Sequence, residues 1–188
     1  MITKRNNFGW QITGEKKLLD TVVMTLTEQQ TVSPEGNPGK YIVMNANDWV
    51  VVVPTISSNG KKYFIMVEQW RHASKSISIE FPGGVVDKGE DPEKAGKREL
   101  LEETGYKAEK LIHLASMSPN PALFSNTIHF YTTTSLKNTN TQHLDEDEFI
   151  QIKKIPVEEV YSSMGTGSYS HGLMCAALFS YKQHLDKN

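Results

Sequence analysis

Three glutamates close together in the sequence could hold a divalent cation. Glu99, Glu102 and Glu103 have a spacing that puts all three on one face of a helix. Without a cation this arrangement is unfavourable, because Glu99 and Glu103 repel each other and a helix C-terminus disfavours negative charge. Carboxylate oxygens are the ligands that Mg²⁺ prefers. A solvated acidic surface has the same spacing, so the glutamates alone leave both interpretations open.

A longer pattern surrounds these glutamates. Pro82, Gly83 and Gly84 lie upstream, and glycine lets the backbone approach a ligand closely. From residue 84 the sequence GVVDKGEDPEKAGKRELLEETGY fits G-x5-E-x7-R-E-U-x-E-E-x-G-U, where U is bulky and apolar. The fixed positions are Gly84, Glu90, Arg98, Glu99, Leu100, Glu102, Glu103, Gly105 and Tyr106. This pattern is the Nudix box, and the chain resembles the Nudix hydrolases.

The resemblance implies an α/β fold, a Nudix α/β/α sandwich with a mixed β-sheet, here preceded by N-terminal strands. It also implies Mg²⁺-dependent hydrolysis of nucleoside diphosphate derivatives, with Mn²⁺ as a possible substitute. The implied metal ligands are Glu99, Glu102, Glu103 and the carbonyl of Gly83. Glu90 and Arg98 would brace the loop against the helix, and Gly84 and Gly105 are structural positions of the box. Gly96 replaces a common alanine and should loosen the helix by up to about 1 kcal/mol.

Residues outside the box resemble the ADP-ribose pyrophosphatases. Glu68-Gln69-Trp70-Arg71 and the acidic Glu80 before the box match their pattern, and Pro121 lies 16 residues after Gly105. The resemblance implies that Arg71, Glu80 and Pro121 bind substrate. Asn126 stands where the subfamily often has glutamate, so related nucleoside diphosphate sugars, GDP-mannose among them, stay open as substrates.

The general base is expected outside the box, because a carboxylate bound to metal is a poor proton acceptor. The resemblance implies the late acidic stretch, residues 145–148. We expect Glu146 to act as the base and Glu148 to assist or to contact metal; Glu102 is the alternative. A solvated acidic loop is an equally simple interpretation of the stretch.

The hydrophobic pattern predicts the elements that position these residues. Asp91, Pro92 and Gly105 predict a helix over residues 91–105. Within it we expect ion pairs between Glu90 and Lys94 and between Glu93 and Lys97. Alternation and turn residues predict a strand or two over residues 17–31, a turn over 33–40, and closing helices over 156–162 and 170–184. Further strands are expected over residues 41–44, 49–53, 63–68, 76–81, 85–86, 111–116, 128–133 and 149–152.

Several other side chains have an ordinary and a functional interpretation. Trp49 is expected in core or dimer packing rather than in base stacking, and Cys175 as an inert core thiol. Phe8, Trp10 and Tyr41 fit an adenine platform and ordinary packing about equally. The six histidines show no metal spacing.

Composition limits the class of protein. The chain has 188 residues, 38% of them hydrophobic, and a net charge of −2, which fits a globular chain and disfavours a general nucleic-acid binder. No apolar run is long enough to span a membrane. A single cysteine excludes an intrachain disulfide. We expect a cytoplasmic protein with no nucleic-acid or membrane partner.

The predicted organisation is a segment of N-terminal strands, residues 1–40, followed by a Nudix hydrolase domain, residues 41–188. The resemblance implies a homodimer that exchanges the N-terminal strands. The expected function is hydrolysis of ADP-ribose or a related nucleoside diphosphate sugar to a nucleoside monophosphate and a sugar phosphate. The alternative is a non-catalytic Nudix-fold nucleotide-ligand sensor.

Overall fold

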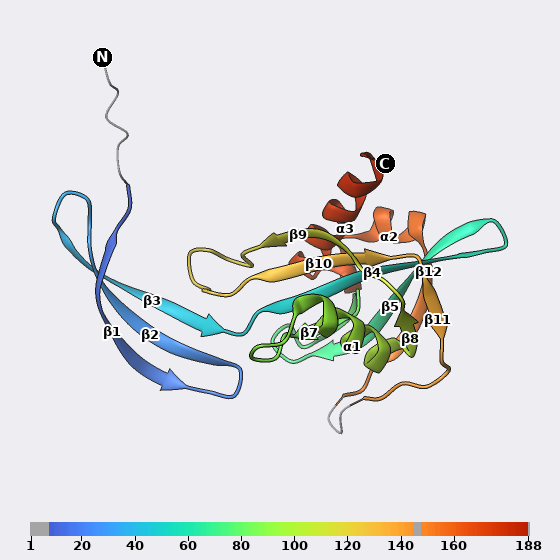
Figure 1. Cartoon of the computed structure of the whole chain (residues 1–188), viewed down its shortest axis with the longest axis horizontal. Coiled ribbons are helices and arrows are strands. Elements are labelled where there is room, and N and C mark those ends of the chain that lie inside the picture. Colours follow the sequence, from blue (N-terminus) through green and yellow to red (C-terminus); the bar gives the residue numbers. More distant parts are fainter. Residues whose placement is uncertain (1–7, 145–147, 188) are drawn as a thin grey trace, which may run out of the picture. The chain divides into compact units, whose positions relative to one another are not determined.

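The structure is a computed structural model that describes residues 8–144 and 148–187. These residues form two compact units (Figure 1). The first unit comprises residues 8–47 and 118–126, and the second comprises residues 48–117 and 127–187. The predicted boundary after residue 40 stays a prediction.

The first unit is built on an antiparallel sheet with the order β1-β2-β3. Its strands are β1 (Gln11–Asp20), β2 (Met24–Val32) and β3 (Pro38–Ala46). The strands predicted over residues 17–31 and 41–44 are therefore present but longer. The turn predicted over residues 33–40 is shorter, because Pro38 already begins β3, and a proline is tolerated at the first residue of a strand.

The second unit contains a seven-stranded mixed sheet. Its main path has the order β12-β5-β4-β10-β9, with β6 paired to β5 and β7 to β4, and β4 runs parallel to β10. Its strands are β4 (Trp49–Ser58), β5 (Lys61–Arg71), β6 (Ser76–Glu80), β7 (Gly83–Val85), β9 (Ile112–Met117), β10 (Ile128–Thr133) and β12 (Gln151–Pro156).

The helices of the second unit are α1 (Pro92–Thr104), α2 (Val157–Ser163) and α3 (Gly172–Leu185), with a short 3₁₀ helix η1 (Gly167–Tyr169). The three predicted helices are confirmed within two residues at each end. A pair of short strands, β8 (Tyr106–Ala108) and β11 (Leu136–Asn138), forms a separate small sheet that the sequence pattern did not predict.

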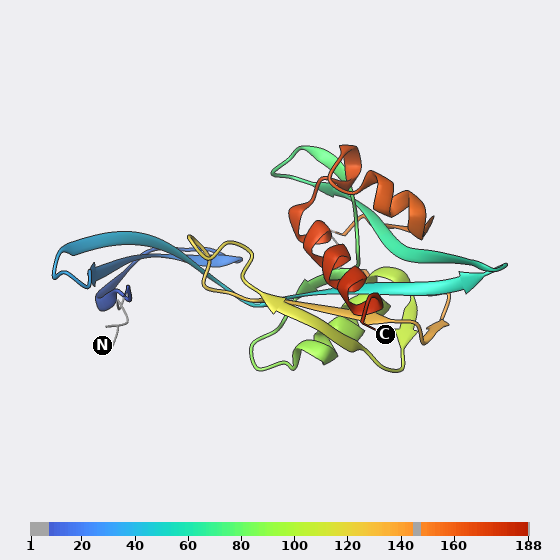
Figure 2. The same ribbon diagram turned by 90° about the horizontal axis from the view of Figure 1, so that it is seen from above.

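Strand β4 explains how the helices cover the sheet. Its four valines, residues 50–53, are all buried, and successive side chains point to opposite faces. Val50 and Val52 pack with Ala95 and Leu100 of α1. Val51 and Val53 belong to the core cluster that contains residues of α2 and α3. The sheet therefore lies between α1 and the two later helices, which confirms the predicted α/β/α sandwich (Figure 2).

The strand predicted over residues 149–152 is shifted. Strand β12 begins at Gln151, and Phe149 before it is 84% exposed. The chain between the end of the late acidic stretch and β12 is therefore outside the sheet. Within the described residues, no helix is both long enough and apolar enough to cross a membrane.

Candidate active site

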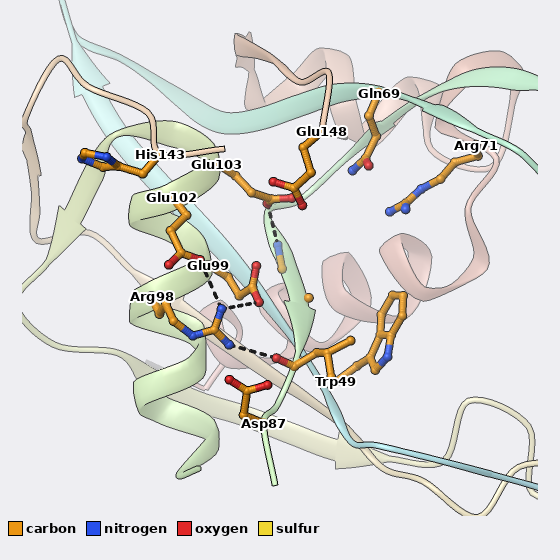
Figure 3. A pocket seen from close by; sticks show the side chains of 13 residues that line it. Trp49, Gln69, Arg71, Asp87, Arg98, Glu99, Glu102, Glu103, His143 and Glu148 are labelled. Carbon is orange, nitrogen blue, oxygen red and sulfur yellow. Dashed lines mark hydrogen bonds and ion pairs between the residues drawn. The ribbon is translucent and has the colours of Figure 1, made fainter. Parts of the chain in front are cut away.

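A cavity of about 400 Å³ lies in the second unit and contains most of the predicted site residues. Figure 3 shows the acidic side chains of α1 on one side of it and Arg71 with Trp49 on the other. Its lining residues come from β4, β5, β7, α1 and the segments around them. They are Trp49, Gln69, Arg71, Gly83, Gly84, Val85, Asp87, Arg98, Glu99, Glu102, Glu103, His143 and Glu148.

Helix α1 positions the acidic side of the cavity. The Asp91 side chain accepts hydrogen bonds from the backbone N–H groups of Glu93 and Lys94, and Gly105 ends the helix in the left-handed conformation. The predicted Glu93–Lys97 ion pair is present, with 2.8 Å between the charged atoms. These caps fix the helix so that its last two turns carry the glutamates to β7.

Arg98 connects the helix to the loop before it. Its guanidinium donates to both carboxylate oxygens of Glu90, at 3.2 and 3.0 Å, and to the carbonyl of Val85 at 3.0 Å. It also bonds Glu99 at 2.8 Å and Glu102 at 3.1 Å. The prediction that Glu90 pairs with Lys94 is therefore wrong. Arg98 offers several donors in a planar fork, and its hydrogen bonds lower the pKa of Glu90.

Glu103 is the most deeply buried acid of the cluster. It is 4% exposed, and its Oε2 accepts a hydrogen bond from the backbone N–H of Gly83 at 2.9 Å. Burial, with the charges of Glu99 and Glu148, raises the pKa of Glu103 to about 8 against the opposing effect of that hydrogen bond and of Arg71. The cluster therefore carries less negative charge at neutral pH than the sequence suggests.

Glu99 lies directly over the glycine turn. A Cβ atom added to Gly84 would come within 2.6 Å of the Glu99 carboxylate, so glycine is required for this approach. Burial raises the pKa of Glu99, and Glu102 and Glu148 add to this effect, while Arg98 opposes it. The Glu99 carboxylate thus lies between the Arg98 guanidinium, which donates a hydrogen bond to it, and the Gly84 backbone, which it approaches closely.

The opposite side of the cavity carries a buried ion pair. Arg71 donates from Nε and Nη2 to the two carboxylate oxygens of Glu80, at 2.8 and 2.7 Å. Burial acts to raise the pKa of Glu80, but the hydrogen bonds and charge of Arg71, with His171, lower it overall. Glu80 is 1% exposed, whereas Arg71 reaches the cavity. Glu80 therefore orients Arg71 rather than lining the cavity itself.

Of the remaining predicted site residues, the structure places Glu148 at the cavity, whereas the roles of Glu146 and Pro121 stay predictions. Glu148 lines the cavity together with the box glutamates. Glu146 lies outside the described residues, so its predicted role as the base is not tested. Pro121 belongs to the first unit and lies within the turn in which the Asn120 side chain accepts a hydrogen bond from the Ala122 N–H. Its predicted role in binding substrate also stays a prediction.

Some cavity residues were not predicted. Trp49 was expected in packing alone, but it both packs against the core and lines the cavity. Its position in the strand that pairs with β7 could have indicated this, because Trp49 stands opposite Val85. Asp87 and His143 also line the cavity, and isolated polar residues in loops give no signal in the sequence.

Other single-residue interpretations are also refined by the structure. Cys175 is half-buried, so it is not a core thiol as expected; the core contact is made instead by its neighbour Met174. Trp10 and Tyr41 form an edge-to-face ring pair in the first unit, with centroids 5.4 Å apart. Phe8 is 80% exposed. Asn126 is buried, donates to the carbonyl of Asn47 at 2.8 Å, and has an unpaired side-chain oxygen.

The acidic side of the cavity fits a divalent cation. In the part of the chain that the structure describes, no three His, Cys, Asp or Glu side chains already stand in a metal-binding arrangement. Arg98 instead bonds Glu99 and Glu102, and the Gly83 N–H bonds Glu103. The donor set is nevertheless that of a hard cation, with five carboxylates on one cavity. A cation would also reverse the raised pKa values of Glu99 and Glu103.

Comparisons with known proteins agree with this geometry. Residues 47–172 match the NUDIX domain family. The chain is 33% identical over 138 residues to the methanol dehydrogenase activator of Bacillus methanolicus, covering 73% of each chain. It is 30% identical over 146 residues to the ADP-ribose pyrophosphatase of Bacillus subtilis (strain 168), covering 77% of each.

Two further proteins are similar over much of the chain. The ADP-sugar pyrophosphatase of Mus musculus is 30% identical over 141 residues, which cover 71% of this chain and 65% of that protein. A crystal structure of an ADP compounds hydrolase superposes with a TM-score of 0.82 over 95% of both chains. At 22% identity, this last similarity shows a shared fold.

Proposed function

Because the chain belongs to the NUDIX domain family, we propose that it hydrolyses the diphosphate linkage of ADP-ribose or a related nucleoside diphosphate sugar. The products are a nucleoside monophosphate and a sugar phosphate. The observation that carries this proposal is the single cavity that has box glutamates on one side and Arg71 on the other. The names of the Bacillus subtilis and mouse relatives support the choice of an ADP-linked sugar.

The proposed cofactor is Mg²⁺, with Mn²⁺ as a possible substitute. Glu99, Glu102, Glu103 and the carbonyl of Gly83 are the proposed ligands, and all four residues line the cavity. When bound, the cation would supply positive charge that neutralises the phosphate oxygens and favours attack by water. Arg98 would have to release Glu99 and Glu102 in part, because it now bonds both carboxylates.

The other side chains have proposed roles in binding and proton transfer. Arg71 uses one N–H of Nε and one of Nη2 for Glu80, so Nη1 and the second N–H of Nη2 are the donors proposed for the diphosphate. The base that takes the proton from the attacking water is proposed to be Glu146, with Glu148 assisting from the cavity wall. Glu102 is the alternative, since it is the most exposed box carboxylate, at 37% of its side chain.

A homodimer in the cytoplasm is also proposed, with exchange of the N-terminal strands. The support is the strand-rich first unit, which presents large apolar side chains to solvent, including Trp10, Ile12 and Leu19. Neither nucleic acid nor a membrane is a proposed partner.

A regulatory role is the second candidate function. The relative from Bacillus methanolicus is named an activator of methanol dehydrogenase, which favours considering a non-catalytic ligand sensor. The presence of every box carboxylate favours the enzyme.

The deciding experiment measures turnover with Mg²⁺ on a panel of nucleoside diphosphate derivatives. We expect kcat/KM to be higher for ADP-ribose than for diadenosine polyphosphates, because the chain resembles the ADP-ribose pyrophosphatases. The reverse order would contradict the proposed substrate class. Tight binding of ADP-ribose without turnover would favour the sensor.

A further inference from the structure

A second cavity, of about 300 Å³, adjoins the first one in the second unit. The two cavities share Trp49 and Arg71 in their linings. The second cavity is also lined by four serines, Ser74, Ser76, Ser78 and Ser170. We call it the serine cavity. A ligand anchored on Arg71 in the first cavity can therefore extend into it.

The serine cavity offers neutral hydrogen-bonding groups. Each serine hydroxyl can donate one hydrogen bond and accept two. Ser76 donates to Ser74 at 2.9 Å, and Ser74 donates to the carbonyl of Arg71, so these hydroxyls already stand along the wall. None of the described lining residues is a carboxylate, in contrast to the first cavity. Such a lining suits hydroxyl groups better than a cation.

His171 adds a donor whose direction is fixed by the fold. It caps α3, and its Nδ1 accepts a hydrogen bond from the backbone N–H of Leu173 at 3.2 Å. In a neutral imidazole the proton must then be on Nε2. Nε2 lies 3.9 Å from a carboxylate oxygen of Glu80, and His171 lines the serine cavity. The cap therefore makes Nε2 the donor nitrogen of a residue that lines the serine cavity.

We propose that the serine cavity binds a sugar ring that is joined to the diphosphate. Its hydroxyls would bond the serines and the His171 Nε2–H, and the apolar face of the ring would lie against Trp49. This inference rests on the proposed function and extends it to the group next to the phosphates. ADP-ribose carries a ribose on each side of the diphosphate, so the experiment must tell the two apart.

The test fills the cavity with one side chain. Ser76 is an exposed residue of β6, so Ser76→Phe should fold and narrow the cavity. Ser57→Phe is the matched control, because Ser57 is also an exposed strand serine but lines neither cavity. With ADP-ribose we expect Ser76→Phe to raise KM at least about tenfold, with kcat nearly unchanged. His171→Asn keeps a helix cap, removes the donor, and should raise KM severalfold.

Two shortened substrates identify the sugar. Adenosine diphosphate methyl ester keeps only the nucleoside ribose, and ribose 5-diphosphate methyl ester keeps only the distal ribose. If Ser76→Phe has a higher KM than Ser57→Phe for adenosine diphosphate methyl ester, the cavity binds the nucleoside sugar. If it has a higher KM for ribose 5-diphosphate methyl ester, the cavity binds the distal sugar. Either result supports the proposal. Equal KM values for Ser76→Phe and Ser57→Phe on all three substrates would overturn it.

Failure of the proposed function can be told apart from failure of this inference. If the wild-type protein hydrolyses none of the substrates with Mg²⁺, the proposed function is wrong. The cavity is then tested by titrating ribose 5-phosphate while recording the NMR signals of the His171 Nε2–H and the Leu173 amide. Saturable shifts that Ser76→Phe abolishes and Ser57→Phe keeps would support a sugar site. Their absence would overturn it.

Discussion

At the scale of single residues, two different effects reduce the repulsion among the acidic side chains of the cluster. Arg98 compensates the charges of Glu90, Glu99 and Glu102, whereas Glu103 is buried and its pKa is raised to about 8. A divalent cation would compete with Arg98 for Glu99 and Glu102 and would replace the proton on Glu103. We therefore expect Glu103 to be the residue at which metal binding and protein stability are most directly coupled.

Glu103→Gln tests this coupling. The amide oxygen of glutamine can still accept the Gly83 N–H, so the free energy of unfolding without metal should not fall. Turnover with Mg²⁺ should fall by about 100-fold or more, because a charged ligand is lost. Mg²⁺ should raise the melting temperature of the wild type and not that of the variant. Near-normal turnover in saturating Mg²⁺ would show that Glu103 is not a required ligand.

Single amide substitutions in the late acidic stretch, residues 145–148, test which of its carboxylates acts as the general base. If Glu146 is the general base, Glu146→Gln should lower kcat by about 10²–10⁴ with little change in KM. Glu148→Gln should lower kcat by less, because Glu148 is proposed only to assist. The control, Asp145→Asn, should be nearly silent. If the Glu146 and Glu148 variants both keep kcat within a few-fold of the wild type, the base is in the box, and Glu102 becomes the candidate.

The Arg71–Glu80 pair predicts a pH dependence of stability. The pKa of Glu80 is lower in the folded protein than its ordinary value of 4.5, so folding favours the ionised form. The pair thus contributes stability that is fully present above about pH 5 and is lost as the pH falls through the folded pKa. At pH 7, Glu80→Gln should lower the free energy of unfolding by about 1–3 kcal/mol, because the half-buried Arg71 loses its charged hydrogen-bond partner.

The measurement is chemical denaturation of the wild type and Glu80→Gln between pH 3 and pH 7. The difference between the two should shrink toward low pH. Glu35→Gln, at an exposed turn residue, is the control and should change the free energy of unfolding by less than about 0.5 kcal/mol at neutral pH. A difference that stays constant down to pH 3 would contradict the role of the carboxylate charge.

Sequence reasoning identified these residues, and the resemblance to the Nudix hydrolases implied the contact between Glu90 and Arg98, but helical spacing alone paired Glu90 with a different residue. The spacing of the box made Arg98 and the glutamates recognisable, and Gln69 with Arg71 pointed to the second side of the cavity. The helical i,i+4 rule then paired Glu90 with Lys94, whereas the structure pairs Glu90 with Arg98. Glu90 precedes the helix, so its partner is decided by the path of the loop, which local spacing does not describe.

At the scale of elements, helices and strands with clear capping residues or hydrophobic periodicity were predicted, and elements without such patterns were not. Asp91, Pro92 and Gly105 marked both ends of α1 because each satisfies a specific backbone requirement. Strands β8 and β11 have three residues each, too few to show alternation. Phe149 has an apolar side chain but is exposed before β12, so its hydrophobicity misled the prediction of that strand.

Gly96 shows how packing can reverse a helix-propensity argument. The sequence suggested that this glycine loosens α1. A Cβ at residue 96 would come within 2.9 Å of Leu111 Cδ1 and 3.1 Å of Val50 Cγ2, so the glycine allows the helix to approach the sheet. Glycine here costs helix propensity but keeps α1, and with it the glutamates, close to β4.

Gly96→Ala should therefore destabilise the protein. The gain of up to about 1 kcal/mol in helix propensity should be outweighed by overpacking, for a net loss of about 1 kcal/mol in the free energy of unfolding. Gly172→Ala is the matched control, because Gly172 is also helical and has open space around its Cβ position. Chemical denaturation of both variants decides the point. Equal stabilisation by both would mean that α1 can shift without cost.

At the scale of the whole molecule, the sheet of the first unit has no buried apolar residue in its three described strands. In β1, β2 and β3, the buried residues are Thr27 and Thr31, and neither is apolar. Leu19, Leu26 and Met44 stand side by side across the three strands. A sheet normally needs an apolar face packed against another layer to be stable. A second copy of the chain is the partner that the resemblance to ADP-ribose pyrophosphatases implies.

We therefore expect a homodimer that depends on this apolar row. Light scattering at micromolar concentration should give twice the 21.2 kDa mass of the chain for the wild type. Ile42 lies two residues from Met44 on the same face of β3, and Leu19 is 56% exposed. The double variant Leu19→Glu/Ile42→Glu should be monomeric, because charges buried in an interface without partners are strongly unfavourable. The control Phe179→Glu, at a 60% exposed position of α3, should stay dimeric. A wild-type protein of monomeric mass would rule out the exchange of strands and leave this face of the sheet to a different partner.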